Sequence, residues 1–321
     1  MKLLHPVARS FGLTMLGVVS VNAAVTIKTA QPYHGWSDVV VLGNGSVEAV
    51  VVPSVGRVMQ FRFTGEADGP FWENPKLAGK LMPEKPWETA HGSFGGDKTW
   101  PAPQSLWNWP PPDVFDAAPL AFRVEADRSV VLTSPASARF GIRTERRLTL
   151  DANSPKLRIV TTYEKVSGPP VETSVWTITQ AKDPVAVFLP VPPASAFPDG
   201  IAKEWPLPKN YVLVQDGLVR LTRDPKDSHK IGNDATSIAW IGEKLALRID
   251  LAKEPGATYP DHGCSAELYT NGDPVPYVEL ELLGPLHMLK VGDRISATNT
   301  YTLYHRDGTA AAVQARKILA P

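Results

Sequence analysis

The sequence predicts an all-β fold, with one large antiparallel domain over residues 24–321. Short runs that alternate apolar and polar residues follow one another along the chain, which is the pattern of half-buried strands. The 31 prolines and 24 glycines supply many turns, and the 43% of hydrophobic residues are enough for a large core. An amphipathic helix is expected near the end, at residues 310–319.

The first 23 residues have the features of a cleavable export signal. Lys2 and Arg9 make a basic start, and residues 11–21 form the apolar run FGLTMLGVVSV before small residues suited to cleavage. This run is too short to cross a bilayer, which takes about 20 apolar residues. The mature chain is therefore expected to be periplasmic or secreted, with no stable membrane insertion after cleavage.

Composition excludes several classes of function. The 33 basic and 33 acidic residues balance, so nucleic acid is not an expected partner. Cys264 is the one cysteine, which rules out an intrachain disulfide. The sequence holds no HExxH, CxxC or P-loop, and its seven histidines are scattered, so neither a metal nor a cofactor is expected.

The strands are expected in a regular series. The first two, 39–42 and 47–52, flank Gly-Asn-Gly at 43–45, because Asn and Gly tolerate the positive φ of tight hairpins. Another follows at 57–63, where RVMQFRF alternates. Further strands are expected at 120–125, 129–133, 138–149, 156–164, 171–180, 185–189, 211–222, 236–241, 244–251, 264–270, 276–283 and 294–304.

Residues 64–118 break this series. The region holds many prolines, five of the nine tryptophans and little periodicity. Since structureless loops of this length are uncommon, we expect a long, ordered and functional loop region. Its aromatic rings are suited either to packing against the C–H faces of a sugar or to anchoring the loops themselves.

The motif GGDKTWPAPQ, residues 95–104, is the most unusual stretch of this region. Its two glycines permit unusual φ values, and its two prolines hold the backbone extended. The motif is therefore expected to be a rigid mount that aims Asp97, Lys98 and Gln104. Lys98 is suited to neutralising nearby glutamates or to binding a sugar hydroxyl or carboxylate. A structural salt bridge that locks the loop is the alternative.

A hairpin near the C-terminus carries several ionisable groups. Its expected strands, 264–270 and 276–283, surround the turn 271–274, and side chains alternate between the two faces of each strand. If the polar faces coincide, one patch holds Glu267, Tyr269, Tyr277, Glu279 and Glu281. This patch is either a solvated outer face or a concave face with acid/base carboxylates and tyrosines for a sugar.

Several motifs, taken in order, resemble one known group of proteins. The stretch GSVEAVVVPSVGRVMQFRF at 45–63 resembles the opening hairpin of the galactose mutarotase-like superfamily, the relatives of aldose 1-epimerase. GGDKTWPAPQ, VWTITQ at 175–180, HKIGN at 229–233 and the segment 264–293 resemble a branch of it that is a domain of unknown function, often exported by bacteria. The resemblance runs from about residue 33 to 305.

The resemblance implies a β-supersandwich, with large antiparallel sheets and a concave face that binds sugars in the characterised relatives. It also implies that the tryptophan-rich loops and the glutamate face share one cleft. In mutarotases a glutamate base takes the proton of the anomeric hydroxyl, and a histidine acid protonates the ring oxygen. Glu279 or Glu281 lies in roughly the region of that base. Trp176 stands where the histidine is sought, and His91, Lys98 or Lys230 would have to replace the acid.

The expected function is that of an exported carbohydrate-binding protein, with a sugar or oligosaccharide as partner and with mutarotase or epimerase turnover left open. A lyase or hydrolase acting on oligosaccharides is one alternative. A non-catalytic envelope structural or polysaccharide-binding protein is the other. Glu281 is the preferred base, with Trp100 and Trp176 as a platform. The catalytic candidates are Glu281, Glu279 and His91, and the substrate-binding candidates are Asp97, Lys98, Trp100, Gln104, Trp176, Lys230, Glu267 and Tyr269.

Overall fold

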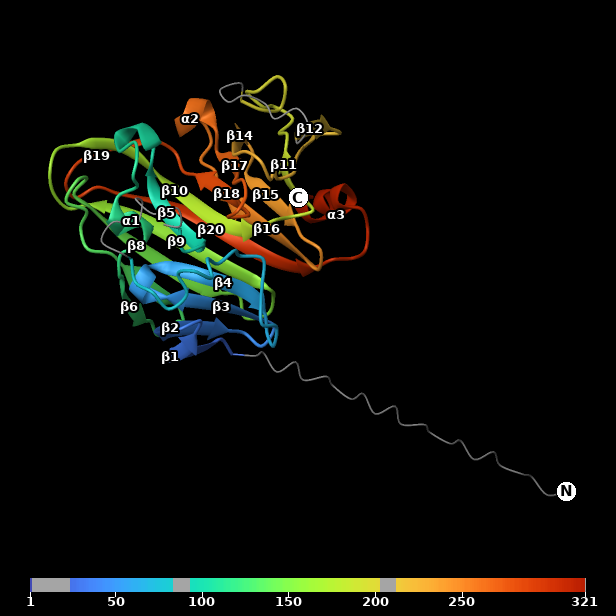
Figure 1. Cartoon of the computed structure of the whole chain (residues 1–321), viewed down its shortest axis with the longest axis horizontal. Coiled ribbons are helices and arrows are strands. Elements are labelled where there is room, and N and C mark those ends of the chain that lie inside the picture. The colour runs from blue at the N-terminus through green and yellow to red at the C-terminus, as the bar shows by residue number, and fades with distance from the viewer. Residues whose placement is uncertain (2–23, 83–92, 203–211, 321) are drawn as a thin grey trace.

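The described part of the chain forms two large antiparallel β-sheets that pack face to face (Figure 1). The structure is a computed structural model, and it describes residue 1 and residues 24–82, 93–202 and 212–320. This architecture confirms the expected all-β sandwich. The expected export signal falls at residues 2–23, outside the described residues. Within the described ranges, no helix is long and apolar enough to cross a membrane.

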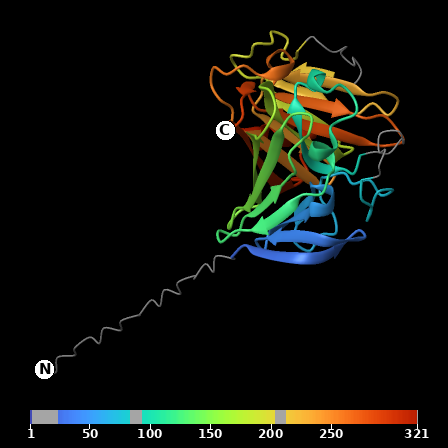
Figure 2. The same ribbon diagram turned by 90° about the vertical axis from the view of Figure 1, so that its left-hand side faces the viewer.

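The first sheet carries most of the residues that matter below. Its strands, in spatial order, are β1 (Thr26–Tyr33), β2 (Trp36–Gly43), β3 (Val47–Val52), β4 (Arg57–Phe63), β5 (Gly96–Ala102), β10 (Val171–Lys182), β18 (Tyr277–Leu283), β17 (Ala266–Thr270) and β14 (His229–Asn233). The short strand β19 (His287–Leu289) pairs with one end of β10. A side view shows β1 to β4, in blue, at one end of the sandwich (Figure 2).

The second sheet covers one face of the first. Its strands, in spatial order, are β12 (Val212–Gln215), β13 (Leu218–Leu221), β11 (Ala186–Pro190), β15 (Ser237–Ile241), β16 (Leu245–Leu251), β20 (Arg294–His305), β9 (Lys156–Lys165), β8 (Ile142–Leu150), β7 (Val130–Thr133) and β6 (Ala121–Val124). The described residues also form three α-helices, α1 (Asp113–Asp116), α2 (Pro260–Gly263) and α3 (Ala311–Leu319), and two short 3-10 helices, η1 (Pro53–Val55) and η3 (Gln104–Leu106). The expected C-terminal helix corresponds to α3, which packs on β11 and β15.

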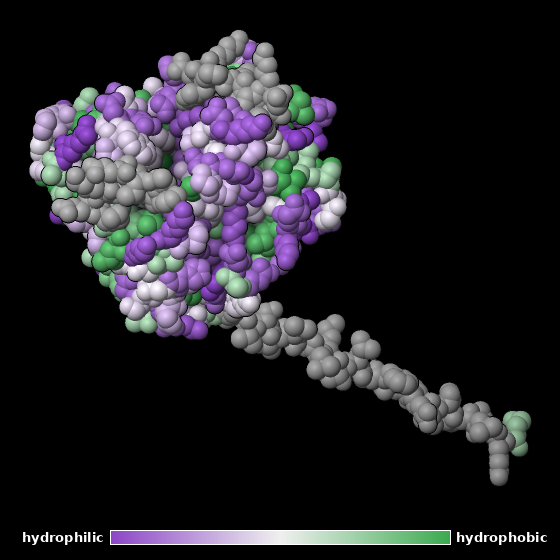
Figure 3. All heavy atoms as spheres, viewed as in Figure 1, coloured by the Kyte–Doolittle hydropathy of each residue, from purple (hydrophilic) through white to green (hydrophobic). Residues whose placement is uncertain are grey.

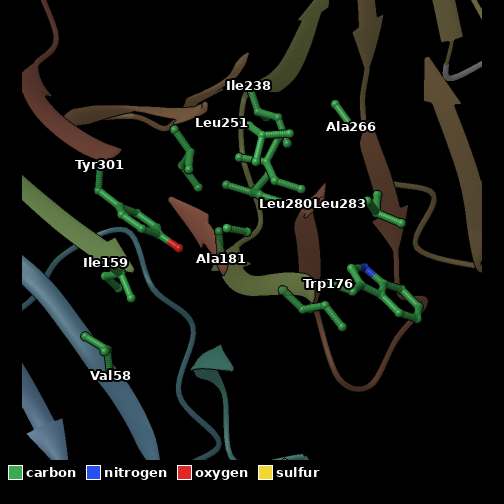
Figure 4. Packing of buried hydrophobic residues seen from close by; sticks show 14 of the residues in the cluster. Val58, Ile159, Trp176, Ala181, Ile238, Leu251, Ala266, Leu280, Leu283 and Tyr301 are labelled. Carbon is green, nitrogen blue, oxygen red and sulfur yellow. The ribbon is translucent and has the colours of Figure 1, made fainter. Parts of the chain in front are cut away.

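The main core lies between the two sheets. Alternate residues of β8 and β9 are buried, as their apolar spacing predicts. Figure 4 shows part of this core, including Val58 of β4, Ile159 of β9 and Tyr301 of β20. Burial of each large apolar side chain stabilises the fold by about 1.5–3 kcal/mol. The outer face of the first sheet is therefore free to carry polar groups, and Figure 3 shows hydrophilic residues in a band down the middle of the viewed face.

Strand β5 corrects the expectation that residues 64–118 are all loop. It lies between β4 and β10 and pairs with β10 over seven positions. Proline is normally excluded from central strands because it lacks an N–H donor. Pro101 is tolerated because β5 pairs with β4 at one position, Val58–Asp97, so no partner on that side needs the missing donor. The prolines thus lie in or next to a strand and do not form the expected loop mount.

The two glycines where β5 begins, Gly95 just before the strand and Gly96 as its first residue, have the unusual backbone that was expected. Gly95 has a φ of +92°, and Gly96 has a φ of +70°. A Cβ at Gly95 would lie 2.1 Å from the backbone oxygen of Trp72, and one at Gly96 would lie 2.5 Å from that of Val58. Glycine is therefore required here for space as well as for φ, since the chain turns into the sheet against two neighbouring backbones.

Candidate functional site

A pocket of about 270 Å³ lies on the outer face of the first sheet. Five adjacent strands supply its floor. Where one strand contributes several lining residues, they lie two or four positions apart and therefore point to the same face of the sheet. From β5 come Lys98 and Trp100, from β10 Trp176 and Gln180, from β18 Tyr277, Glu279 and Glu281, from β17 Tyr269, and from β14 Lys230. Ser93, Gln104 and Trp109 complete the lining from the loops on either side of β5.

Glu279 is the most exposed of the three carboxylates at the pocket. It is 8% exposed, and the register of β10 and β18 places it opposite Gln180. Gln180 Nε2 donates to Glu279 Oε1 at 2.9 Å, and Ser93 Oγ donates to Gln180 Oε1 at 2.5 Å, which fixes the orientation of the amide. Burial, together with repulsion from Glu281, raises the pKa of Glu279 to about 7. Glu279 therefore exchanges a proton readily near neutral pH.

Glu281 is held more tightly than Glu279 and is 1% exposed. Its Oε2 accepts a hydrogen bond from Trp176 Nε1 at 2.8 Å and one from Lys230 Nζ at 3.0 Å. Lys230 Nζ also lies 2.6 Å from Oε2 of Glu267, which is fully buried beneath the pocket. These three charged groups, Lys230, Glu267 and Glu281, form an ion triad in the floor.

Burial and charge oppose each other within the ion triad. Burial lowers the pKa of Lys230, but attraction from the two carboxylates outweighs burial, so the pKa ends above its ordinary value. Burial raises the pKa of Glu267 well above its ordinary range, despite the nearby lysine. Lys230 is therefore a fixed cation that neutralises the floor.

A second buried network holds Lys98. Lys98 Nζ donates to Asp116 Oδ1 at 3.0 Å, and Trp100 Nε1 donates to the same oxygen at 2.9 Å. Arg57 Nη2 donates to Asp116 Oδ2 at 2.9 Å. Burial raises the pKa of Asp116, but the two cations outweigh it and hold the pKa low. Burial also lowers the pKa of Lys98, so this ammonium group gives up its proton more easily than that of an exposed lysine.

The two tryptophans of the floor already have cations over their rings. Lys98 Nζ lies 3.7 Å from the ring centroid of Trp100, and Lys230 Nζ lies 4.6 Å from that of Trp176. The exposed fractions of Trp100 and Trp176 are 6% and 2%, so little of either ring is left for a ligand. Trp109, edge-on to Trp100 and 56% exposed, presents the largest aromatic surface of the lining.

Asp97 does not lie in the pocket, although it was expected beside Lys98. Neighbouring residues of a strand point to opposite faces, so Asp97 points into the core between the sheets. It is fully buried there, forms an ion pair with Arg146 and accepts hydrogen bonds from Thr179 and Tyr301. Asp97 therefore contributes to the packing between the sheets, and Lys98 is the residue of the two that lines the pocket.

The structure brings most of the other expected residues together. Eight of them line the pocket: Lys98, Trp100, Gln104, Trp176, Lys230, Tyr269, Glu279 and Glu281. Glu267 lies under the pocket, and His91 lies outside the described residues. Sequence reasoning did not select Ser93, Trp109 or Gln180, and it placed Tyr277 in the glutamate patch without naming it among the binding candidates. The four-residue spacing of Gln180 from Trp176, on one face of a strand, is the signal that would have found Gln180.

The two sheets form a β-sandwich with the galactose mutarotase-like fold. The chain belongs to the family described as domain of unknown function DUF4380, whose model matches residues 38–304. No curated protein matches the sequence. The expected resemblance to the superfamily and to a branch of unknown function is thus confirmed.

Solved structures with the same fold share little sequence with the chain. A galactose mutarotase-like protein from Lactobacillus casei has a TM-score of 0.56 at 9% identity, covering 83% of this chain and 100% of that one. A galactose mutarotase related enzyme from Lactobacillus acidophilus has a TM-score of 0.51 at 9% identity, with coverage of 83% and 97%. A TPR-domain containing protein from Parabacteroides distasonis has a TM-score of 0.57 at 12% identity, covering 83% of this chain. The chain spans 46% of that protein's length. At these identities the likeness shows the fold alone.

Proposed function

We propose that the protein binds a sugar in this pocket and transfers protons at its anomeric centre, as a mutarotase or epimerase does. The observation that carries the proposal is the environment of Glu279, a buried carboxylate that lines a pocket and has a pKa near 7. A general base works best when its pKa lies near the working pH. The mutarotase-like class adds a sugar as the natural ligand of such a pocket, by analogy of fold.

The chemistry follows from two groups of the lining. Glu279 takes the proton of the anomeric hydroxyl, so that the carbonyl forms as the bond between the anomeric carbon and the ring oxygen breaks. Lys98 gives a proton to the ring oxygen, which leaves as a hydroxyl. Its lowered pKa makes that ammonium a stronger acid than an ordinary lysine. Rotation of the aldehyde and closure with the two transfers reversed yield the other anomer.

The remaining lining residues fit the task of holding a sugar ring. Trp109 offers an exposed aromatic face, and apolar faces of this kind suit the C–H side of a pyranose. Burial raises the pKa of Tyr277 well above its ordinary value, so its hydroxyl stays protonated and able to donate. Export belongs to the proposal as well. It is supported by the N-terminal sequence pattern, and N-terminal sequencing of the protein recovered from a periplasmic extract tests it.

The experiment has two stages. A thermal-shift screen of the purified protein against neutral hexoses, uronic acids and amino sugars finds the ligand, because a ligand that binds the native state raises the melting temperature. Exchange between the anomers of that sugar is then followed by NMR. Glu279→Gln is expected to lower kcat by about 10²–10⁴-fold, the usual contribution of a general base. Glu172→Gln, an exposed change on the neighbouring strand β10, is the matched control.

The outcomes separate the candidate functions. If Glu279→Gln exchanges anomers at the rate of the wild-type protein, the assigned base is wrong. A sugar that binds without any exchange by the wild-type protein would leave a carbohydrate-binding protein in place of an enzyme. If no sugar raises the melting temperature at millimolar concentration, the proposal fails as a whole.

A further inference from the structure

A second and larger pocket adjoins the candidate site. Its volume is about 580 Å³, and its lining includes Trp36, Trp72, Glu73, His34, Ala78 and Lys182. The two pockets share a wall. The ring of Trp72 lies 4.8 Å from the ring of Tyr277, and the backbone N–H of Trp72 donates to the carbonyl oxygen of Gln180 at 2.9 Å. Tyr277 and Gln180 line the first pocket, so a ligand too long for the first pocket would extend past them into the second pocket.

The second pocket has polar groups that are already oriented. Glu73 Oε1 accepts hydrogen bonds from Tyr33 Oη at 2.5 Å and from Gln60 Nε2 at 3.0 Å. Its Oε2 lies 3.0 Å from His34 Nδ1. Burial raises the pKa of this carboxyl despite these contacts. A fixed carboxylate beside an imidazole offers both acceptors and donors to hydroxyl groups, which is the polar chemistry of carbohydrate recognition.

His34 itself is held in an uncommon backbone conformation. Its φ is +46°, in the left-handed region that few residues other than glycine adopt, at the tip of the β1–β2 hairpin. The imidazole stacks on the ring of Tyr33 at 4.0 Å, while its side chain stays 52% exposed at the pocket. His34 and Gly35, with a φ of +95°, are the two central residues of this hairpin turn, and such a turn requires a positive φ at both, so the turn fixes His34 beside the pocket.

We propose that the two pockets are neighbouring subsites of one site, so that the ligand is a carbohydrate chain of two or more units and not a free monosaccharide. This inference rests on the proposed function, since it names the class of sugar that the same site takes. The first pocket, at 270 Å³, falls below the range of about 300–1,000 Å³ usual for small-molecule sites, and the second, at 580 Å³, lies inside that range. One sugar ring occupies the first, and the chain passes the Trp72–Tyr277 wall into the second.

The test compares chain lengths on the full protein. Calorimetry measures binding of glucose, galacturonate and N-acetylglucosamine, and of their β-1,4- or α-1,4-linked oligomers up to the tetramer. For one of these series, the dimer or trimer is expected to bind at least about tenfold more tightly than the monomer, because it gains contacts in the second pocket. Monomers and oligomers of equal affinity would overturn the inference.

A blocking substitution identifies the pocket responsible. Ala78 is an exposed residue of the second pocket, so Ala78→Trp fills that space without changing the core. It is expected to abolish the gain with chain length and to leave monomer affinity within about twofold. Ala126→Trp, a change at another exposed alanine, in the β6–β7 turn of the other sheet, is expected to keep the gain.

The remaining outcomes are decisive as well. A gain with chain length that survives Ala78→Trp would overturn the second subsite, because the extra units would then be bound elsewhere. Glu73→Gln supplies an independent variant, and it is expected to weaken oligomer binding more than monomer binding. Binding of a monomer with no gain rejects the second subsite alone. Failure of every saccharide to bind rejects the proposed function, and this inference with it.

Discussion

Replacement of Asp116 by asparagine is expected to destabilise the protein strongly. Asp116 is 1% exposed and accepts hydrogen bonds from Arg57, Lys98 and Trp100 at 2.9–3.0 Å. An asparagine in its place keeps one acceptor oxygen but turns an amide N–H₂ group towards one of the two cations. Both cations stay buried, because their exposed fractions are 0% for Arg57 and 2% for Lys98. The change therefore removes the only carboxylate that contacts both cations among the described residues.

The magnitude follows from these contacts. Removal of one partner of a buried ion pair costs about 3–5 kcal/mol, since the other partner is left as an uncompensated buried charge. We expect the free energy of unfolding to fall by about that amount near neutral pH. Because the folded state lowers the pKa of Asp116, its stabilisation is complete above the unfolded pKa of about 4 and is lost as the pH falls through the lower, folded pKa. The difference between the two proteins therefore narrows in strong acid.

Urea denaturation followed by circular dichroism measures the effect for the wild-type protein and for Asp116→Asn at two pH values. Asp113→Asn is the matched control, because Asp113 lies in the same helix α1 and is exposed. Changes of that kind usually shift stability by less than about 0.5 kcal/mol. A loss below about 1 kcal/mol for Asp116→Asn, similar to the control, would refute the account of a charge network that depends on this carboxylate.

Three further predictions concern the pocket. The kcat/KM for anomer exchange is expected to rise as the pH passes about 7, because the proposed base Glu279 must lose its proton; a profile that is flat from about pH 5 to 8 contradicts this role. Lys230→Met leaves Glu267 and Glu281 buried without their cation, so unfolding free energy falls by about 3–5 kcal/mol at pH 8. Part of this loss returns at about pH 5, because the raised pKa of Glu267 favours its protonated form in the folded protein, and a loss that does not depend on pH would exclude the ion triad. Trp109→Ala is expected to weaken sugar binding about tenfold at an unchanged melting temperature, while unchanged affinity would remove Trp109 from the ligand contact.

Most strands were predictable because their two faces meet different surroundings. In β9 and β20, one face packs in the core and the other meets solvent, and the expected ranges 156–164 and 294–304 match Lys156–Lys165 and Arg294–His305 closely. In β5 all seven residues are buried, and polar Asp97 and Thr99 point into the core. The usual contrast between the faces is absent there, so the pattern of β5 resembles a loop.

Most residues of the site were predictable from the sequence, but the different environments of its two glutamates were not. Glu279 and Glu281 look equivalent on one face of a strand, and Glu281 was the expected base. The structure distinguishes them by their neighbours, because Lys230 and Trp176 from other strands bond to Glu281, whereas an amide holds Glu279. Such partners come from positions 51 to 105 residues away, and local patterns contain no information about that pairing.

The unequal exposure of the tryptophans gives the protein a built-in optical signal. Among the tryptophans in the described ranges, Trp109 is 56% exposed and each of the others is at most 9% exposed. An indole in contact with water emits at longer wavelength than a buried one, and dissolved iodide quenches it by collision. The red edge of the emission therefore comes mainly from Trp109 within this set, at the mouth of the pocket. A saccharide seated against that ring would shift the emission to the blue and protect it from iodide, so binding is measurable on the unlabelled protein.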